Sequence, residues 1–257
     1  MIEPYYKDNH ATIYHGDCLD ILPEIGTVDL VLADPPYGTT ACEWDSVIPL
    51  EPMWEQLKRI IKPNGAIVLF GSEPFSSALR ISNIKNYKYD WIWVKDKATN
   101  HLNARKMPLK KTENISVFYG KQCRYTPQLH DKHPEDIRPP TTFRPNISNY
   151  GTMNKVSTRT IPIEKGYPCE VLFYKGCSGG GVVSFHPTQK PVTLMQYLIK
   201  TYTNEGDTVL DFTMGSGTTL RAAKNLGRTA IGIEKKEKYC QTAVDRLRQE
   251  VLNFGGD

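Results

Sequence analysis

Four consecutive residues, Asp34-Pro35-Pro36-Tyr37, place an acidic side chain, two prolines and an aromatic ring directly after an apolar run. A carboxylate and free carbonyl oxygens can accept hydrogen bonds from an amino group, and a tyrosine ring can stack on a planar base. Neither proline has a backbone N–H, and each restricts the residue before it to an extended conformation. These residues therefore predict a stiff turn that presents acceptors and a ring to one crevice. A plain Pro-rich turn, with Tyr37 covering the edge of the core, is the alternative.

A second set of candidate residues surrounds a glycine turn late in the chain. The strand pattern at 207–211 ends in Asp211, and Gly215 and Gly217 follow before a helical pattern. Glycines permit positive φ and the close approach of a ligand, and the start of a helix offers free N–H groups. Glu234 ends the next strand pattern, 234 − 217 = 17 residues past the second glycine. This is near the spacing at which an acidic residue binds ribose hydroxyls.

The glycine turn does not complete a dinucleotide-binding fingerprint. That fingerprint needs Gly or Ala two residues after Thr218, and the position holds Leu220. Asp211 beside the glycines would repel a phosphate but would suit the ammonium group of an amino-acid cofactor. The pattern favours S-adenosylmethionine over NAD or FAD. A tight strand-to-helix turn that binds nothing is the alternative.

Strand and helix patterns alternate along the chain, and they must position these turns. Strand patterns cover residues 12–14, 28–33, 66–70, 89–94, 115–119, 207–211 and 229–233. Helical spacing begins at Pro52, after Pro74, at Val192, at the glycine turn and near Lys235. This alternation predicts an α/β fold with a doubly wound, mostly parallel sheet, in which 89–94 and 115–119 pair as an antiparallel edge. Parallel strands end at one edge of a sheet, so Asp34 and Asp211 should face the same crevice.

The composition is ordinary for a soluble globular protein, with 39% hydrophobic and 23% charged residues among 257. The apolar run at 66–70 is far too short to span a membrane, and the first residues lack a secretory pattern. The six cysteines include no close CxxC pair, which argues against a zinc or redox site. We therefore expect a cytoplasmic protein with reduced thiols, no bound metal and no membrane partner.

The formal net charge of +4 is unevenly distributed along the sequence. From Lys95 to Arg124, eight basic residues stand against two acidic ones, 8 − 2 = +6, which leaves 4 − 6 = −2 for the remainder. A local basic stretch on a near-neutral body is typical of a phosphate-binding face. A merely solvated surface has the same pattern, so both interpretations stay open at this point.

Residues 120–185 lack the periodicity of the rest of the chain. They hold seven prolines and then a Ser-Gly-Gly-Gly tract at 178–181. An irregular segment of this length is uncommon in a compact domain unless it is functional or mobile. We expect residues 1–119 and 186–257 to form the catalytic and cofactor-binding domain. Residues 120–185 would be an inserted recognition or lid region, with a disordered linker as the alternative for the Gly-rich tract.

Three motifs in this order resemble the amino-methylating DNA methyltransferases: Asp34-Pro-Pro-Tyr37, His186-Pro-Thr-Gln-Lys-Pro191 and Asp211-Phe-Thr-Met-Gly-Ser-Gly217. The tetrapeptide precedes the cofactor glycines and the variable region lies between them, an order that resembles the β class of the family. The resemblance covers nearly the whole chain and implies a Rossmann-like, S-adenosylmethionine-dependent methyltransferase fold. Aspartate in the tetrapeptide is the form typical of adenine-N6 methylation, whereas serine is commoner in cytosine-N4 enzymes.

The resemblance implies a role for each matching residue. Asp34 and the Pro35 carbonyl would accept hydrogen bonds from the target amine of a flipped-out base, and Tyr37 would stack on that base. Pro36 completes the catalytic tetrapeptide. The residues assigned to S-adenosylmethionine are Asp17, Cys18, Asp34, Thr188, Lys190, Asp211, Phe212, Thr213, Gly215, Ser216, Gly217, Thr218 and Glu234. Those assigned to DNA are Lys95, Lys97, Arg105, Lys106, Lys110 and Lys111.

Within these roles, Glu234 would hold the ribose hydroxyls and Asp17 would contact the adenine end of the cofactor. The segment Phe212-Thr-Met214 departs from the commoner Phe-x-Gly form of the cofactor turn, which leaves open which backbone atoms contact the cofactor. The insertion would recognise the target sequence.

Several alternatives stay open after the resemblance is stated. The base could be cytosine, modified at N4. The tetrapeptide also occurs in methyltransferases of RNA bases and of protein glutamine, although their usual order places the cofactor glycines first. A different class would be a non-catalytic DNA-binding protein with a vestigial cofactor pocket. A homodimer, a restriction-endonuclease partner and a bacterial, archaeal or phage origin are also left open.

Overall fold

The computed structural model describes residues 2–38, 46–137, 147–148, 151–152, 162–177 and 189–249. The chain divides into two compact units. The larger unit contains Met1–Thr126 and Glu170–Asp257, and the smaller unit contains Pro127–Cys169. Both of the turns singled out in the sequence belong to the larger unit, so the candidate site is built on that unit alone.

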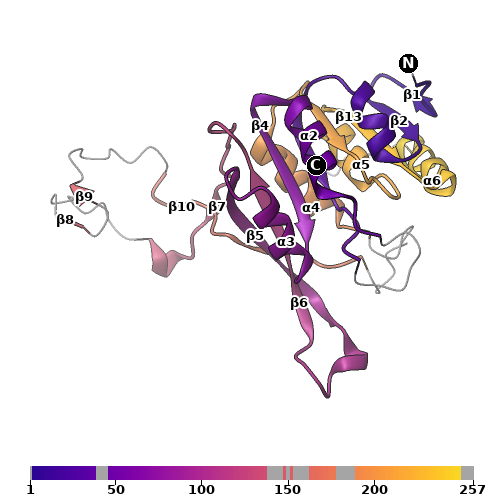
Figure 1. Ribbon diagram of the computed structural model, residues 1–257. Coiled ribbons are helices and arrows are strands. Elements are labelled where there is room, and N and C mark those ends of the chain that lie inside the picture. The colour runs from indigo at the N-terminus through magenta and orange to yellow at the C-terminus, as the bar shows by residue number, and fades with distance from the viewer. Residues whose placement is uncertain are drawn as a thin grey trace. The chain divides into compact units, whose positions relative to one another are not determined.

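The described part of the larger unit forms a nine-stranded sheet (Figure 1). In spatial order the strands are β1 (Tyr6–Lys7), β2 (Ala11–His15), β13 (Thr229–Glu234), β12 (Thr208–Asp211), β3 (Val28–Ala33), β4 (Ile61–Gly71), β6 (Lys110–Phe118), β5 (Tyr87–Thr99) and β11 (Val171–Phe173). Strands β2, β13, β12, β3 and β4 run parallel to one another. The predicted doubly wound, mostly parallel sheet is therefore confirmed.

Helices cover both faces of this sheet. They are α1 (Cys18–Ile21), α2 (Leu50–Ile60), α3 (Phe75–Ser82), α4 (Val192–Tyr202), α5 (Thr218–Asn225) and α6 (Glu237–Arg248), with the 3₁₀ turns η1 (Leu22–Glu24) and η2 (His101–Asn103). Leu30 and Leu32 of β3 join the core cluster formed with α4, α5 and α6, whereas Val31 and Ala33 join the cluster formed with α1, α2 and α3. Burial on both faces explains why every residue of β3 except the half-buried Asp29 is apolar.

The predicted antiparallel pairing is confirmed by β5 and β6, in which Trp91 lies opposite Ile115, but these two strands do not form the edge of the sheet. The two strands extend past the predicted ranges as a β5–β6 ribbon, because after a register shift beyond Val94 the pairing resumes with Thr99 opposite Lys110. In Figure 1 this ribbon extends beyond the other strands of the sheet. β11 adds a parallel strand outside β5, an addition that sequence periodicity did not predict.

Several element boundaries differ from the expectation, and two of the differences lie at prolines. α2 begins at Leu50 instead of Pro52, because proline is tolerated in the first turn of a helix, where its missing N–H has no partner to lose. β4 begins at Ile61, well before Ala66. Its pairing with β3 shifts between Val28 and Leu30, so the segment with Pro63 and Gly65 is accommodated as an irregularity at the start of the strand.

The smaller unit contains two short antiparallel ladders among its described residues. β7 (His130–Asp131) pairs with β10 (Lys165–Gly166), and β8 (Ile147–Ser148) pairs with β9 (Gly151–Thr152). A 3₁₀ turn, η3 (Pro134–Asp136), follows β7. The predicted insertion at 120–185 is wider than this unit, because its residues 171–173 form β11 in the main sheet. That residues of the insertion recognise a target stays a prediction.

Candidate active site

A cavity of about 740 Å³ lies where the parallel strands end. Asp17 after β2, Asp34 after β3, Asp211 at the end of β12 and Glu234 at the end of β13 all line it. The structure therefore brings together the two turns singled out in the sequence, as expected for the carboxyl edge of a parallel sheet. Trp93 and Lys95 of β5 and Glu113 of β6 line the same cavity from the antiparallel side.

Asp34 is the acceptor at the tetrapeptide. Its Oδ1 accepts a short hydrogen bond from the hydroxyl of Tyr37, and its Oδ2 accepts one from the Lys190 ammonium at 2.5 Å. The Tyr37 ring stacks on Phe75 of α3, with centroids 5.2 Å apart and planes inclined by 27°. The tetrapeptide thus presents a half-buried carboxylate and the Tyr37 ring at the cavity wall, and Phe75 packs against that ring.

A row of alternating charges continues from Asp34 across the cavity. Lys190, buried, also lies 3.3 Å from Oε2 of Glu113, and Oε1 of Glu113 accepts a short hydrogen bond from Lys95. Two carboxylates and two ammonium groups balance formally, which is how charged groups become tolerable in a protein interior. The sequence does not predict these ion pairs, because the family resemblance implies a cofactor contact for Lys190 and a DNA contact for Lys95.

Each group in this row alters the titration of its neighbours. Burial raises the pKa of Asp34, the Lys190 ammonium opposes that rise, and the Glu113 carboxylate adds to it. Burial also acts to raise the pKa of Glu113, but Lys190 and Lys95 together hold it below its ordinary value. The pKa of Lys190 is raised, because the two carboxylates outweigh its burial. Lys190 therefore keeps its charge and favours the carboxylate form of Asp34.

Asp211 is buried at the start of the glycine turn, with 4% of its surface exposed. Its Oδ2 accepts from the Thr219 hydroxyl at 2.5 Å and its Oδ1 accepts from the Thr213 N–H at 3.1 Å. Burial raises the pKa of Asp211 to about 7, against the effect of these hydrogen bonds. A cation placed beside Asp211 would stabilise its carboxylate form.

Glu234 closes the same end of the cavity. Its Oε2 accepts from the Gly215 N–H at 3.0 Å and its Oε1 accepts from the Lys236 N–H at 2.8 Å. Burial raises its pKa, and the backbone N–H groups oppose this. A carboxylate has about four acceptor positions, so Glu234 retains capacity for a pair of hydroxyl donors after these two bonds.

The glycine turn is held from behind by α6. The buried Arg246 donates to the Ser216 carbonyl at 2.6 Å and to the Thr218 hydroxyl at 3.1 Å. Gly217 has φ +75°, and a Cβ at this position would lie 2.6 Å from the Cβ of Ala243. Phe212, Thr213, Gly215, Ser216 and Thr218 line the cavity, whereas Gly217 does not. Gly217 instead permits the close packing of the turn on α6.

The remaining predicted cofactor residues lie at the adjacent strand end or outside the described chain. Asp17 caps α1 by accepting from the Leu19 N–H at 3.0 Å, and it pairs with Lys235 at 3.1 Å. Asp17 and Cys18 both line the cavity, so the capping role and a ligand-facing position coexist. Thr188 lies outside the described residues.

The residues predicted to bind DNA are divided by the structure. Lys95 points at Glu113 within the cavity, and Lys97 is exposed at the cavity lining. Arg105, Lys106 and Lys111 are exposed along the end of the β5–β6 ribbon. Lys110, also exposed, donates to the Ser72 hydroxyl and to the Glu73 carbonyl, each at 3.3 Å. That these side chains contact DNA stays a prediction.

The cavity fits an amino-acid cofactor that carries a nucleoside. Thr213 Oγ1 is buried at the cavity lining with no hydrogen-bond partner among the described residues. Asp211 beside it offers a carboxylate to an ammonium group, and Glu234 offers acceptors to ribose hydroxyls. In the described part of the chain, no three His, Cys, Asp or Glu side chains are grouped to hold a metal ion. No helix among the described residues is long and apolar enough to cross a membrane.

Comparison with known proteins identifies the family. Residues 28–245 match the N6/N4 methyltransferase family, described as DNA methylase. The chain belongs to this family. It is 28% identical over 274 residues to the Type II methyltransferase M2.DpnII of Streptococcus pneumoniae, covering 97% of this chain and 94% of that protein. It is 26% identical over 263 residues to the Type II methyltransferase M1.MboII of Moraxella bovis, covering 94% and 98%.

Solved structures agree with this assignment. The complex of M1.HpyAVI with S-adenosylmethionine is 27% identical, has a TM-score of 0.62 and covers 93% of this chain and 100% of its own. The cytosine-N4-specific PvuII DNA methyltransferase is 18% identical, with a TM-score of 0.67 and coverage of 99% and 91%, and shows the fold alone. The predicted family, fold and cofactor are confirmed: this member of the N6/N4 family is an S-adenosylmethionine-dependent DNA methyltransferase.

Sequence reasoning missed three contributors to the site: Glu113, Trp93 and Arg246. Glu113 is an acidic residue within the basic stretch and precedes the strand predicted at 115–119, whereas in the structure it lies within β6. Arg246 is a cation on the apolar side of a C-terminal helix, which indicates a buried partner. Trp93 lies two residues after Trp91, on the same face of β5. Its burial was therefore predictable, but the fact that it lines the cavity was not.

Proposed function

We propose that this protein transfers the methyl group of S-adenosylmethionine to the exocyclic N6 amine of an adenine flipped out of DNA. One observation supports this most directly: Asp34, beside the Tyr37–Phe75 aromatic pair, shares a cavity with Asp211 and Glu234. The acceptor for an amine and the acceptors for the cofactor therefore open on one space. A base inside a duplex cannot reach such a cavity, which is why flipping is part of the proposal.

The proposed mechanism assigns acceptance of the amine to Asp34. An N–H of the incoming amine donates to Oδ1 in place of the Tyr37 hydroxyl, while Lys190 keeps Oδ2 paired and the carboxylate ionised. This hydrogen bond localises the amine lone pair. S-adenosylmethionine supplies the electrophilic methyl group. As the amine nitrogen bonds to the methyl carbon, the methyl–sulfur bond would break and S-adenosylhomocysteine would leave. The positive charge that develops on the amine faces the Asp34 carboxylate, so a preorganised acceptor stabilises the transition state, and the methylated amine then loses a proton to this carboxylate or to solvent.

The aromatic wall holds the plane of the base. Tyr37 contributes the ring face, and Phe75 beneath it keeps that ring in place, since a stacked aromatic pair adds to the energy of burial. The site holds the amine in line with the methyl group that it attacks. This orientation removes much of the entropic cost of bringing the two groups together, which is a large part of the rate enhancement available to such a site. Aspartate in the tetrapeptide supports adenine over cytosine, whose N4 amine would meet the same acceptors.

The test is transfer of a labelled methyl group. The protein is incubated with S-adenosylmethionine labelled in its methyl group and with PCR-amplified, unmethylated DNA, and the DNA is hydrolysed to nucleosides. N6-methyladenine is the expected product. N4-methylcytosine would overturn the base assignment, and label found only in added RNA or in protein would overturn the DNA substrate.

The Asp34→Ala variant separates catalysis from binding. It should lose transfer by at least about 100-fold, the effect of removing a preorganised acceptor, while its affinity for S-adenosylmethionine stays close to that of the parent. Loss of both properties would mean that Asp34 acts mainly on the cofactor. DNA binding by the parent protein without any transfer would support the non-catalytic alternative.

A further inference from the structure

The end of the β5–β6 ribbon exposes apolar side chains. Leu102, in the 3₁₀ turn η2, is fully exposed at 101%, and Met107 and Leu109 are exposed at 49% and 39%. Figure 1 shows that this turn lies at the far end of the ribbon. Contiguous exposed apolar surface can mark an interaction site, and here Leu102, Met107 and Leu109 lie close together in the sequence at the end of one projecting element.

The same segment is uniformly cationic. Between residues 97 and 111 there are five Lys or Arg side chains and no Asp or Glu. They are Lys97, Arg105, Lys106, Lys110 and Lys111. An apolar tip surrounded by cations is complementary to duplex DNA, which carries phosphates outside and apolar stacked bases within.

The turn is ordered by its own hydrogen bonds. Asn100 adopts φ +72°, and its side-chain oxygen accepts from Asn103 at 2.7 Å. The Lys106 N–H donates to the Asn103 carbonyl at 2.8 Å. Nε2 of His101 lies 2.9 Å from the Ala98 carbonyl. Because the turn is already formed, placing it in a partner costs less conformational entropy than ordering a flexible loop would.

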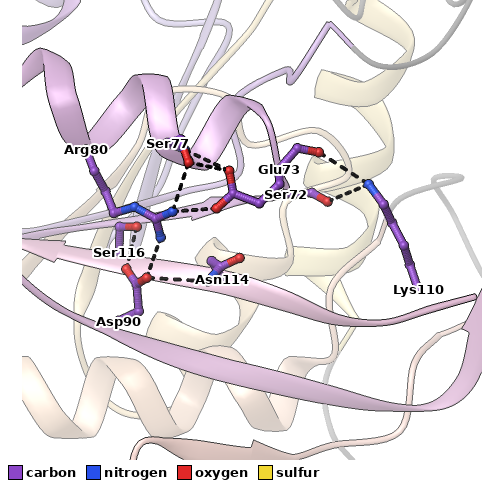
Figure 2. A network of polar contacts seen from close by, with 8 residues as sticks. All are labelled: Ser72, Glu73, Ser77, Arg80, Asp90, Lys110, Asn114 and Ser116. Atoms are coloured by element: carbon purple, nitrogen blue, oxygen red, sulfur yellow. Dashed lines mark hydrogen bonds and ion pairs between the residues drawn. The ribbon is translucent and has the colours of Figure 1, made fainter. Parts of the chain in front are cut away.

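A polar network fixes the ribbon to the core, as Figure 2 shows. Lys110 reaches the Ser72 hydroxyl and the Glu73 carbonyl at the start of α3. Arg80 of α3 bridges Glu73 and Asp90 of β5, the latter at 2.5 Å. Asp90 in turn accepts from Ser116 of β6 at 2.6 Å. These contacts therefore fix β5 and β6 to α3 and to the residues that precede it.

The tip is also close to the cavity along the chain. Lys97, Ala98 and Thr99 line the cavity, and Leu102 follows only three residues later. Three residues span at most about 11 Å, a length that corresponds to about three base steps of a duplex. An element at this position can act on the same stretch of DNA that supplies the target base.

We propose that the β5–β6 turn inserts into the DNA base stack, and that Leu102 is the wedge that fills the space left by the flipped base. The proposal rests on the proposed function, since it assumes a duplex DNA substrate. Apolar side chains of this kind enter base steps in other DNA-binding proteins and offset the cost of unstacking. The surrounding cations hold the phosphates on either side of the opened step.

The test first locates the methylated position and then varies its pairing. The parent protein is incubated with PCR-amplified DNA, and the modified base is mapped by sequencing. The site is then made as a short duplex in which the target base is either paired or opposite an abasic position. Leu102→Ala is compared with Ile84→Ala, an equally apolar change at a side chain that is 63% exposed and precedes β5 at the other end of the ribbon.

Leu102→Ala should lower kcat/KM at least about tenfold on the paired duplex and less than about twofold on the abasic duplex, where little unstacking is required. Ile84→Ala should match the parent on both. Because Leu102 is fully exposed, its truncation disturbs no buried packing, and activity on the abasic duplex verifies folding. Equal losses on the two duplexes, or no loss on the paired one, would overturn the wedge. Absence of any transfer by the parent would instead overturn the proposed function, and the wedge with it.

Discussion

The Lys190 ammonium lies 2.5 Å from Oδ2 of Asp34, a contact between residues 156 positions apart in the sequence. It links the segment before α4 to the turn after β3, and so joins two of the motifs by which the chain resembles its family. The same ammonium lies 3.3 Å from Oε2 of Glu113. Because these groups are buried or half-buried, the protonation of each depends on the others. By favouring the carboxylate form of Asp34, Lys190 makes it a stronger hydrogen-bond acceptor for an amine than the protonated carboxyl group would be.

Substitutions at Lys190 and Glu113 should shift the pH dependence of methyl transfer in opposite directions. Lys190→Met removes the cation that lowers the pKa of Asp34. The acid limb of the plot of kcat/KM against pH should therefore move to higher pH. Glu113→Gln removes a charge that raises the same pKa, so the limb should move to lower pH. Transfer rates measured between about pH 5 and 9 would show this.

Lys58→Met, at an exposed position on α2, removes a charge of the same sign as Lys190 and should leave the acid limb in place. Shifts in the same direction for Lys190→Met and Glu113→Gln would show that the limb reports a group other than Asp34.

Much of the fold could be predicted because local patterns and tertiary requirements agree. The run at 28–33 is apolar except at Asp29 and ends just before Asp34 and two prolines, and β3 has the same bounds, Val28–Ala33. The glycine turn precedes a helix, and α5 begins at Thr218, directly after Gly217. In both places the residue types exclude other backbone conformations, so a short stretch of sequence is sufficient.

The charge row could not be predicted, because it depends on the order of strands in the sheet. Glu113 meets Lys190 only because β6 lies between β4 and β5, an arrangement that periodicity does not specify. Lys95 belongs to the basic stretch of the sequence. It lies two residues after Trp93 on β5, however, and lines the cavity as Trp93 does. β11 is three residues long and carries too little pattern to stand out in an irregular segment.

Affinity for S-adenosylmethionine should increase with pH up to about the pKa of Asp211. Burial raises that pKa to about 7, so below this value the free protein holds a proton that an ammonium group must displace. Each pH unit below 7 should then weaken binding by up to about tenfold. Quenching of the fluorescence of Trp93, which lines the cavity, offers a measurement between about pH 5.5 and 7.5.

Asp211→Asn should bind the cofactor more weakly and with a nearly flat pH dependence over this range. Asp245→Asn, at an exposed position on α6, should retain both the affinity and the slope of the parent. A slope that survives in Asp211→Asn would assign the titration to another group, such as Glu234, whose pKa is also raised by burial.

Alanine substitutions at Gly206 and at Gly217 should separate two costs at the cofactor turn, that of a strained backbone and that of close packing. Gly217 lies in this turn, and Gly206 serves as the comparison. Gly206 and Gly217 have φ +81° and +75°, but an added Cβ meets nothing within 4 Å at Gly206 and lies 2.6 Å from the Ala243 Cβ at Gly217. Gly206→Ala should lower the free energy of unfolding by about 1–2 kcal/mol, the cost of a left-handed residue. Gly217→Ala should cost about 1–3 kcal/mol more, from overpacking. Equal losses in chemical denaturation would mean that α6 moves away without penalty.

The exposed cations at the end of the ribbon should determine part of the salt dependence of DNA binding. In Arg105→Gln with Lys106→Gln, the slope of log K against log salt concentration should become shallower by about 0.9 for each phosphate that the protein no longer neutralises. The matched control, Lys85→Gln with Lys88→Gln, removes the same charge from exposed positions at the opposite end of the ribbon.

Fluorescence anisotropy of a labelled duplex between about 50 and 200 mM salt would measure both slopes. If the two double variants changed the slope equally, the effect would come from net charge and not from the position of Arg105 and Lys106. A change confined to Arg105 and Lys106 would place the DNA backbone at the same turn that carries Leu102. The duplex would then lie beside the mouth of the cavity that holds Asp34, because Lys97, Ala98 and Thr99 line that cavity.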